Sequence, residues 1–427
     1  MDLTDDLQRM AFSCYLNERS QELSITPQKI EDNLGVDERT VRRYLSKDLK
    51  QIPKTIKPKT YFDIKTLLKF SDEDFKNYVQ IRRARFNVPI PRNLYFTGRE
   101  DFLIKLHEAL NDKHEVVVKP TQRAKAISGL GGVGKTQTVA EFAHRYQAEY
   151  SAVLWVTADG KDLLRSNFAG LSTLLGFKAE KQDDQILDVQ SWLRNNTDWL
   201  LIFDNAETLD ILTAAKGLLP TDAKGHVLFT TRAQATGSLA SVTVDCFDDD
   251  TGAVFLLRRS KLVAMELSTI EEVRPNIPNN GWETATALVH ELGGLALAID
   301  QAGAYIEQTG CGLAGYLERF RKSAAELLKY RGAESDDDHP EAVYKTFLLA
   351  WHKAQERHPL VDDILCMSAF LHPDGIPEEI FASYEPLELD KALAALKDYS
   401  LINRLMAERM FTVHRLVQVV VRDVHHG

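Results

Sequence analysis

The eight residues from Gly129 to Thr136, Gly-Leu-Gly-Gly-Val-Gly-Lys-Thr, constrain the fold of this 427-residue chain more than any other feature. They fit the pattern GxxxxGK[ST] in full, with an apolar run before them and an amphipathic segment after them. Glycines in such a loop let backbone N–H groups close around phosphate oxygens, and the start of the following helix adds a positive dipole. The pattern predicts a strand, a phosphate-binding loop and a helix; a chance glycine turn is the alternative.

Three residues carry the predicted chemistry of this loop and its neighbour. Lys135 is expected to reach the β- and γ-phosphates of a nucleotide, and the Thr136 hydroxyl to bind Mg²⁺. A second metal ligand is expected at the end of a neighbouring strand, and the apolar run 199–203 ends in Asp204. That carboxylate would hold Mg²⁺ through water. The alternative is an aspartate in the turn that ends the strand.

Five apolar, β-rich runs alternate with helix-length segments after residue 96. These runs are Lys125–Gly129, Ala152–Val156, Trp199–Phe203, His226–Thr230 and Val242–Phe247. Continuous apolar runs between helices predict a parallel sheet that is covered on both faces. Arg232 follows the fourth run, where an arginine could sense the γ-phosphate in cis. The alternative is a surface arginine after a strand.

The order of five motifs resembles the NB-ARC branch of the signal-transduction ATPases with numerous domains (STAND). The motifs are GLGGVGKT (129–136), LLIFDN (200–205), LFTTR (228–232), GGLALA (293–298) and VHRL (413–416). The resemblance covers about residues 93–425 and implies an α/β P-loop NTPase, followed by a helical bundle and a winged helix. It also implies an ADP-bound closed state and an ATP-bound state that opens and oligomerises.

The resemblance also implies roles for individual residues. It places the backbone of 96–100 and Arg99 near the adenine, 293–298 against the adenine, and His414 on the β-phosphate of ADP. The nucleotide-binding residues it implies are Thr97, Arg99, Gly129, Gly131, Gly132, Val133, Gly134, Lys135, Thr136, Gln137, Leu295, Ala296 and His414. The catalytic residues it implies are Lys135, Asp204, Asn205 and Arg232. Without the resemblance, His414 also fits a helix cap or a core histidine.

The chain departs from the family pattern at four positions. Asn205 stands where many relatives have a second aspartate, and an amide can position a water but cannot accept its proton. Ala296 replaces a proline, Arg415 replaces an aspartate, and Val413 replaces a methionine. We therefore expect slow hydrolysis, so that ADP, ATP and Mg²⁺ serve a switch rather than an ATPase of rapid turnover.

Charge is spread unevenly along the chain. Residues 1–92 carry a net charge of +4, whereas residues 93–427 carry −14. Within the basic part, Ile25–Lys47 resembles a DNA-binding helix-turn-helix. Its second helix would present Arg39, Thr40, Arg42, Arg43 and Lys47 to duplex DNA. Asp37 and Glu38 at the start of that helix would repel phosphate, so two functions stay open: a DNA-binding transcription regulator, or an NLR-like defence platform whose head recruits a protein partner.

The pattern of predicted helices, strands and loops divides the chain into five segments. They are 1–60 (helix-turn-helix-like effector), 61–92 (linker with a short helix), 93–248 (P-loop nucleotide-binding domain), 249–333 (helical domain) and 340–427 (winged helix). The four cysteines lie far apart without a CxxC pair, which predicts neither a disulfide framework nor a zinc site. No signal peptide or membrane span is visible, so we expect a cytoplasmic protein. Because relatives carry a C-terminal sensor of repeats, we expect either a truncated chain or a sensor supplied in trans.

Overall fold

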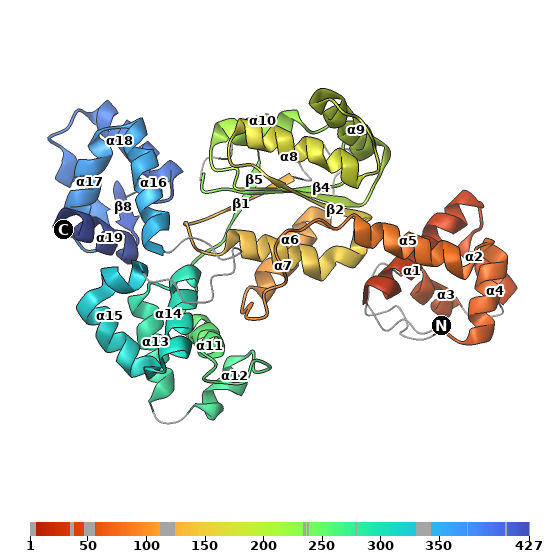
Figure 1. Ribbon diagram of the computed structural model, residues 1–427, viewed down its shortest axis with the longest axis horizontal. Coiled ribbons are helices and arrows are strands. Elements are labelled where there is room, and N and C mark those ends of the chain that lie inside the picture. The colour runs from red at the N-terminus through yellow and green to blue at the C-terminus, as the bar shows by residue number, and fades with distance from the viewer. Residues whose placement is uncertain are drawn as a thin grey trace.

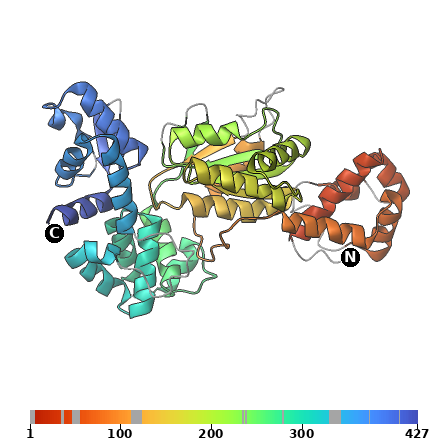
Figure 2. The same ribbon diagram turned by 45° about the horizontal axis from the view of Figure 1, so that its top comes forward.

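A central sheet, a helical head and two further groups of helices make up the fold (Figure 1). The computed structural model describes residues 6–34, 38–46, 56–111, 124–233, 236, 239–277, 280–329, 343–373, 375–405 and 408–426. The head projects from one end of the molecule in both views, and the C-terminal groups lie at the other end (Figure 2).

The central sheet has five parallel strands in the order β2-β3-β4-β1-β5. The strands are β1 (Ala124–Ser128), β2 (Ala152–Thr157), β3 (Trp199–Asp204), β4 (His226–Thr230) and β5 (Ala240–Thr243). The predicted α/β P-loop fold is confirmed. The fifth strand begins and ends earlier than predicted, because its last pair, Thr243 with Ser128, lies at the end of β1.

Strands β1 to β4 are buried on both faces, because helices cover both sides of the sheet and successive side chains point to opposite sides, whereas β5 at the edge is largely exposed. Leu200 and Ile202 pack toward α6 (Glu100–Asn111) and α7 (Lys135–Tyr146). Leu201 and Phe203 pack on the other face, under α8 (Lys161–Leu174), α9 (Gln182–Asn195) and α10 (Leu209–Gly217). This alternation explains why β3 reads as a continuous apolar run that ends in a carboxylate.

The head consists of α1 (Asp6–Glu22), α2 (Pro27–Leu34), α3 (Glu38–Tyr44), α4 (Pro58–Leu68) and α5 (Asp72–Ala84). Its apolar core joins Phe12 of α1 to Ile64 and Leu68 of α4 and to Phe75 and Val79 of α5. The segment 61–92 was predicted as a linker with one short helix, whereas it supplies most of α4 and all of α5. The reason is apolar spacing of four residues in each helix, which gives each helix a face to bury.

The head is joined to the edge of the sheet by backbone contacts. The N–H of Asn87 donates to the carbonyl of Val153 in β2 at 3.1 Å, and the N–H of Val153 donates to the carbonyl of Arg85 at 2.9 Å. The buried guanidinium of Arg82 in α5 donates to the carbonyls of Ala148 and Tyr150, each at 3.2 Å. The end of α5 is therefore held against the edge strand β2.

Two helical groups follow the sheet. The first contains α11 (Asp249–Arg259), α12 (Ile270–Val273), α13 (Gly281–Glu291), α14 (Ala296–Thr309) and α15 (Gly312–Lys329). The C-terminal group contains α16 (Val343–Arg357), α17 (Leu360–Ser368), α18 (Pro386–Asp398), α19 (Arg415–His426) and an antiparallel sheet β6-β8-β7 (Ile376–Pro377, Met410–Val413, Ile402–Leu405). Across the described ranges, no helix is long and apolar enough to span a bilayer.

Candidate nucleotide-binding site

The loop between β1 and α7 is tightly packed. Gly129 has φ +145°, and a Cβ there would lie 2.5 Å from the carbonyl oxygen of Val244. Gly134 has φ +97° and directly precedes the first residue of α7. The backbone N–H groups at the start of this helix have no intrahelical partners and favour an anion. The loop at the start of α7 is therefore where an anion would be expected to bind.

Lys135 turns its ammonium group back onto the loop. Nζ donates to the carbonyl oxygens of Gly129 at 2.8 Å and Leu130 at 3.1 Å. Loss of water around the ammonium group, reinforced by the positive charge of Arg232, lowers the pKa of Lys135 to about 7. A phosphate in the loop would supply the missing negative charge and favour the protonated lysine.

Thr136 and Asp204 meet at the carboxyl end of the sheet. The Thr136 hydroxyl donates to Oδ1 of Asp204 at 2.8 Å, and Thr230 at the end of β4 donates to the same oxygen at 2.5 Å. Burial raises the pKa of Asp204 in spite of these hydrogen bonds. A hydroxyl and a carboxylate are the all-oxygen donors that Mg²⁺ prefers, so the residues fit that ion. Sequence reasoning missed Thr230, although its place at the end of a buried strand beside β3 could have revealed it.

Arg232 and Asn205 lie beside this cluster. Nε of Arg232 pairs with Oε1 of Glu207 at 2.8 Å, and Nζ of Lys353 in α16 lies 3.5 Å from Oε2 of the same carboxylate. A Cβ on Gly131 would lie 3.6 Å from the guanidinium carbon of Arg232, so this cation is next to the loop. The exposed Asn205 has φ +66°, and its N–H donates to the Thr230 hydroxyl at 2.9 Å.

The segment 96–100, which is predicted to lie near the adenine, contacts the P-loop through Arg99. Arg99 donates to the carbonyl of Val133 at 2.6 Å and to the Thr138 hydroxyl at 2.9 Å, and burial lowers its pKa to about 10. The side chain of Thr97 is buried and accepts a hydrogen bond from Arg258 at 2.7 Å. Gln137 accepts one at 3.3 Å from Asn93.

The turn between α13 and α14 contacts the loop directly. The N–H of Leu297 donates to the carbonyl of Gly132 at 3.0 Å. The Cβ of Ala296 lies 3.8 Å from the place that a Cβ on Gly134 would take, and Leu295 is fully buried. The structure therefore brings 295–297 to the P-loop.

The His414 ring contacts the turn between α13 and α14. Its Nε2 lies 3.1 Å from the carbonyl oxygen of Gly293, and Arg415 donates to the carbonyl of His290 at 2.6 Å. A cavity of about 750 Å³ nevertheless joins His414 to the P-loop. Its lining includes Gly129, Leu130, Val133, Thr243, Phe247, Gly293, Ser400 and His414. Lys135, Thr136 and Asp204 do not line it.

The candidate DNA-binding residues lie on α3 in the head. Val41 and Tyr44 of this helix are buried, whereas Arg39, Arg42 and Arg43 are exposed and Thr40 is half-buried. Lys47 lies outside the described residues. The described part of α3 thus has an apolar inner face and a basic outer face.

Three comparisons with known proteins bear on this geometry. Residues 352–424 match a family described as a domain of unknown function, DUF7779. The chain is 30% identical over 375 residues to a nucleotide-binding leucine-rich repeat (NLR)-like protein of the fungus Hyaloscypha variabilis. That alignment covers 80% of this chain and 36% of the relative, so the chain spans about a third of the relative's length.

Solved structures show partial likenesses. A STAND protein with a tetratricopeptide repeat sensor from Pyrococcus horikoshii is 17% identical, with a TM-score of 0.32 over 78% of this chain and 43% of that one. Cdc6p from Pyrobaculum aerophilum is 16% identical, with a TM-score of 0.37 over 80% of this chain and 98% of that one.

Proposed function

We propose that the chain is a nucleotide-controlled switch of the NB-ARC/STAND type, supported by its complete P-loop motif and by its likeness to an NLR-like protein over 375 residues. In this proposal ADP holds a closed arrangement, and ATP opens the molecule and allows copies of the chain to associate. Hydrolysis of ATP is slow and resets the switch, because the amide of Asn205 cannot take a proton from water.

The observation that carries the proposal is direct contact of both C-terminal groups with the P-loop region. From the first group, Leu297 bonds to Gly132. From the C-terminal group, the Ser400 hydroxyl donates to the carbonyl of Arg232 at 2.8 Å. Thr346 of α16 also lies against the loop, since its Cγ2 is 3.2 Å from the place of a Cβ on Gly131. A change in the conformation of the phosphate site would therefore alter contacts made by both groups.

Arg232 connects the phosphate site to α16. Its guanidinium pairs with Glu207, which also contacts Lys353 of α16. We infer that Arg232 turns from Glu207 toward the γ-phosphate when ATP replaces ADP, which breaks this arrangement. The carbonyl of Arg232 accepts the Ser400 hydrogen bond, so any backbone shift that accompanies this movement would also disturb the contact with Ser400.

Lys135, Thr136 and Asp204 would hold the phosphates and the metal. Lys135 would leave the loop carbonyls and donate to phosphate oxygens, and Thr136 and Asp204 would hold Mg²⁺. When bound, the magnesium ion neutralises charge on the phosphates. Thr230 keeps the Asp204 carboxylate oriented through its hydrogen bond.

Titration with ADP and Mg²⁺ tests the site. We expect Lys135→Ala to abolish binding, whereas Lys161→Ala, which removes an exposed lysine of α8, should bind like the parent chain. Normal ADP binding by Lys135→Ala would show that the site is assigned wrongly. A turnover of many ATP molecules per second would contradict the role as a switch.

For the head we propose binding of duplex DNA, supported by the exposed Arg39, Arg42 and Arg43 on α3. Affinity should fall as salt rises, and the double change Arg42→Ala with Arg43→Ala should reduce the slope of log affinity against log salt by about 2. The double change Lys76→Ala with Arg83→Ala removes the same charge from α5 and should alter the slope less. A DNA affinity that changes neither with salt nor with loss of the α3 arginines would favour the second candidate function, in which the head recruits a protein.

A further inference from the structure

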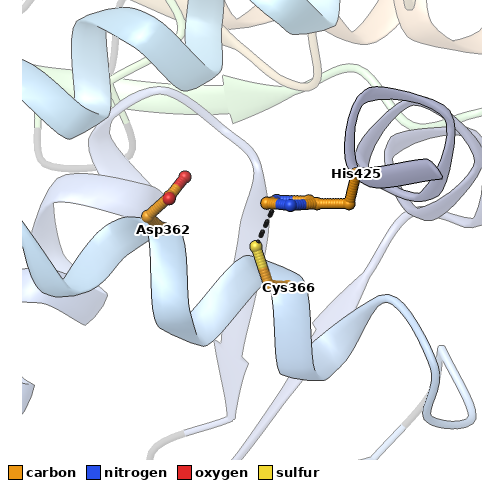
Figure 3. Close-up of side chains that lie close together, drawn as sticks. All are labelled: Asp362, Cys366 and His425. Atoms are coloured by element: carbon orange, nitrogen blue, oxygen red, sulfur yellow. Dashed lines mark hydrogen bonds between the residues drawn. The ribbon is translucent and has the colours of Figure 1, made fainter. Parts of the chain in front are cut away.

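Three side chains with metal-binding atoms converge in the C-terminal group (Figure 3). Asp362 and Cys366 lie four residues apart on α17, so they share one face of that helix. His425 comes from α19 and points toward Cys366, with Sγ and Nε2 2.6 Å apart. One ligand atom from each of the three residues lies within 4.8 Å of the others. This cluster has no part in the phosphate site.

We propose that Asp362, Cys366 and His425 bind a single Zn²⁺ ion, with water as the fourth ligand. Sulfur, imidazole nitrogen and carboxylate oxygen are the atoms that zinc takes in tetrahedral sites. The cysteine spacing gave no sign of this site, because its ligands lie far apart along the chain and meet only after folding. This proposal differs from the expectation, drawn from cysteine spacing, that the cysteines form no zinc site.

The cluster needs only a small adjustment to accept the ion. At zinc distances of about 2.3 Å to sulfur and 2.0 Å to nitrogen, a tetrahedral site separates the two atoms by about 3.5 Å. His425 is exposed and can swing outward by this amount, whereas Asp362 and Cys366 stay fixed on one helix. The exposed side also gives the ion and its water a route in.

The surroundings support the ligands. The indole N–H of Trp351 donates to Oδ1 of Asp362 at 3.1 Å, and its ring lies 5.7 Å from that of His425. This bond leaves the second carboxylate oxygen for the metal and orients the ligand, as outer-shell partners do in metal sites. As the Zn–S bond forms, the Cys366 thiol would release its proton to solvent.

The ion would fasten α17 to α19, which already pack together. The other end of α19 carries Arg415, which contacts the carbonyl of His290 on α13. Zinc would therefore stabilise the helix that carries a contact between the two C-terminal groups.

Cobalt binding to the whole, untagged chain tests the proposal. One equivalent of Co²⁺ should produce the near-ultraviolet absorption of a cobalt thiolate, and Zn²⁺ should displace it. The absorption should be lost in Cys366→Ser, and His425→Ala should lower the affinity at least tenfold. Cys311→Ser, which removes a half-buried cysteine elsewhere, should leave both unchanged.

Thermal unfolding tests metal binding independently of the cobalt spectrum. At the same zinc concentration, zinc should raise the Tm of the parent chain and of Cys311→Ser clearly more than that of His425→Ala. Because His425 is exposed near the end of α19, its removal should leave the chain folded even where Cys366→Ser is unstable. The proposal fails when the parent chain shows no cobalt-thiolate absorption, when that absorption survives Cys366→Ser, or when His425→Ala binds as well as the parent.

Discussion

Nucleotide affinity is predicted to fall as pH rises above 7, because Lys135 must be protonated to hold phosphate. In the free protein its pKa is lowered from 10.5 to about 7 by loss of water around the ammonium group and by Arg232. Bound phosphate favours the charged form, so binding raises this pKa again. Below pH 7 the lysine is already charged, whereas above pH 7 a proton must be taken up on binding.

The size of the effect follows from the pKa. One pH unit above the free-state pKa, about nine-tenths of the lysines are neutral, which lowers affinity about tenfold, or about 1.4 kcal/mol. At two units the loss is about a hundredfold, or about 2.7 kcal/mol. The trend ends only when pH reaches the higher pKa of the bound state.

Calorimetry in two buffers of different ionisation enthalpy measures directly how many protons the protein takes up when it binds nucleotide. Near pH 8 the nucleotide phosphates are fully ionised, since their second pKa is about 6, so we expect uptake of about 0.9 proton from Lys135. Lys135→Arg keeps its charge and should show almost no uptake. The reasoning is refuted when the parent chain takes up no proton at this pH and its affinity stays level between pH 7 and pH 9.

Substitutions at Gly294 and Glu207 test the packing around the site, with Gly310 as a control. Gly294 and Gly310 both have φ +64°, but a Cβ at Gly294 would lie 2.1 Å from the carbonyl oxygen of Phe247, whereas nothing lies within 4 Å at Gly310. Gly310→Ala should cost about 1–2 kcal/mol of unfolding free energy and Gly294→Ala clearly more by urea titration; equal costs would contradict the packing. Glu207→Gln leaves Arg232 without its carboxylate partner and should cost about 2 kcal/mol in the same assay, whereas a change below about 0.5 kcal/mol would mean that the pair is only a surface contact.

The sheet was predictable from the sequence because four of its strands, β1 to β4, are buried on both faces, whereas the edge strand β5 is largely exposed. Its apolar runs therefore stand out, and β2, β3 and β4 begin where predicted. The head was less predictable, because the segment 61–92 was interpreted as a linker with one short helix, whereas α4 begins at Pro58 and α5 follows it. Proline fits the first turn of a helix as well as it fits a loop, so the residue type alone could not decide.

Some contacts of the candidate site were likewise predictable from the sequence, and others were not. Lys135, Thr136 and Asp204 come together because the P-loop and the end of β3 meet at one edge of the sheet. Their positions follow from motif and topology. The pairing of Arg232 with Glu207 and the meeting of Cys366 with His425 depend on how turns and helices pack. These contacts join residues whose spacing in the sequence carries no pattern.

The mass of the chain in solution, measured by light scattering with each nucleotide, tests the central claim most directly. With ADP and Mg²⁺ we expect the mass of one chain, and with a non-hydrolysable ATP analogue and Mg²⁺ a multiple of it. Lys135→Ala should give the same mass under both conditions. The claim is contradicted when the parent chain binds both nucleotides, as calorimetry would show, but keeps one mass throughout.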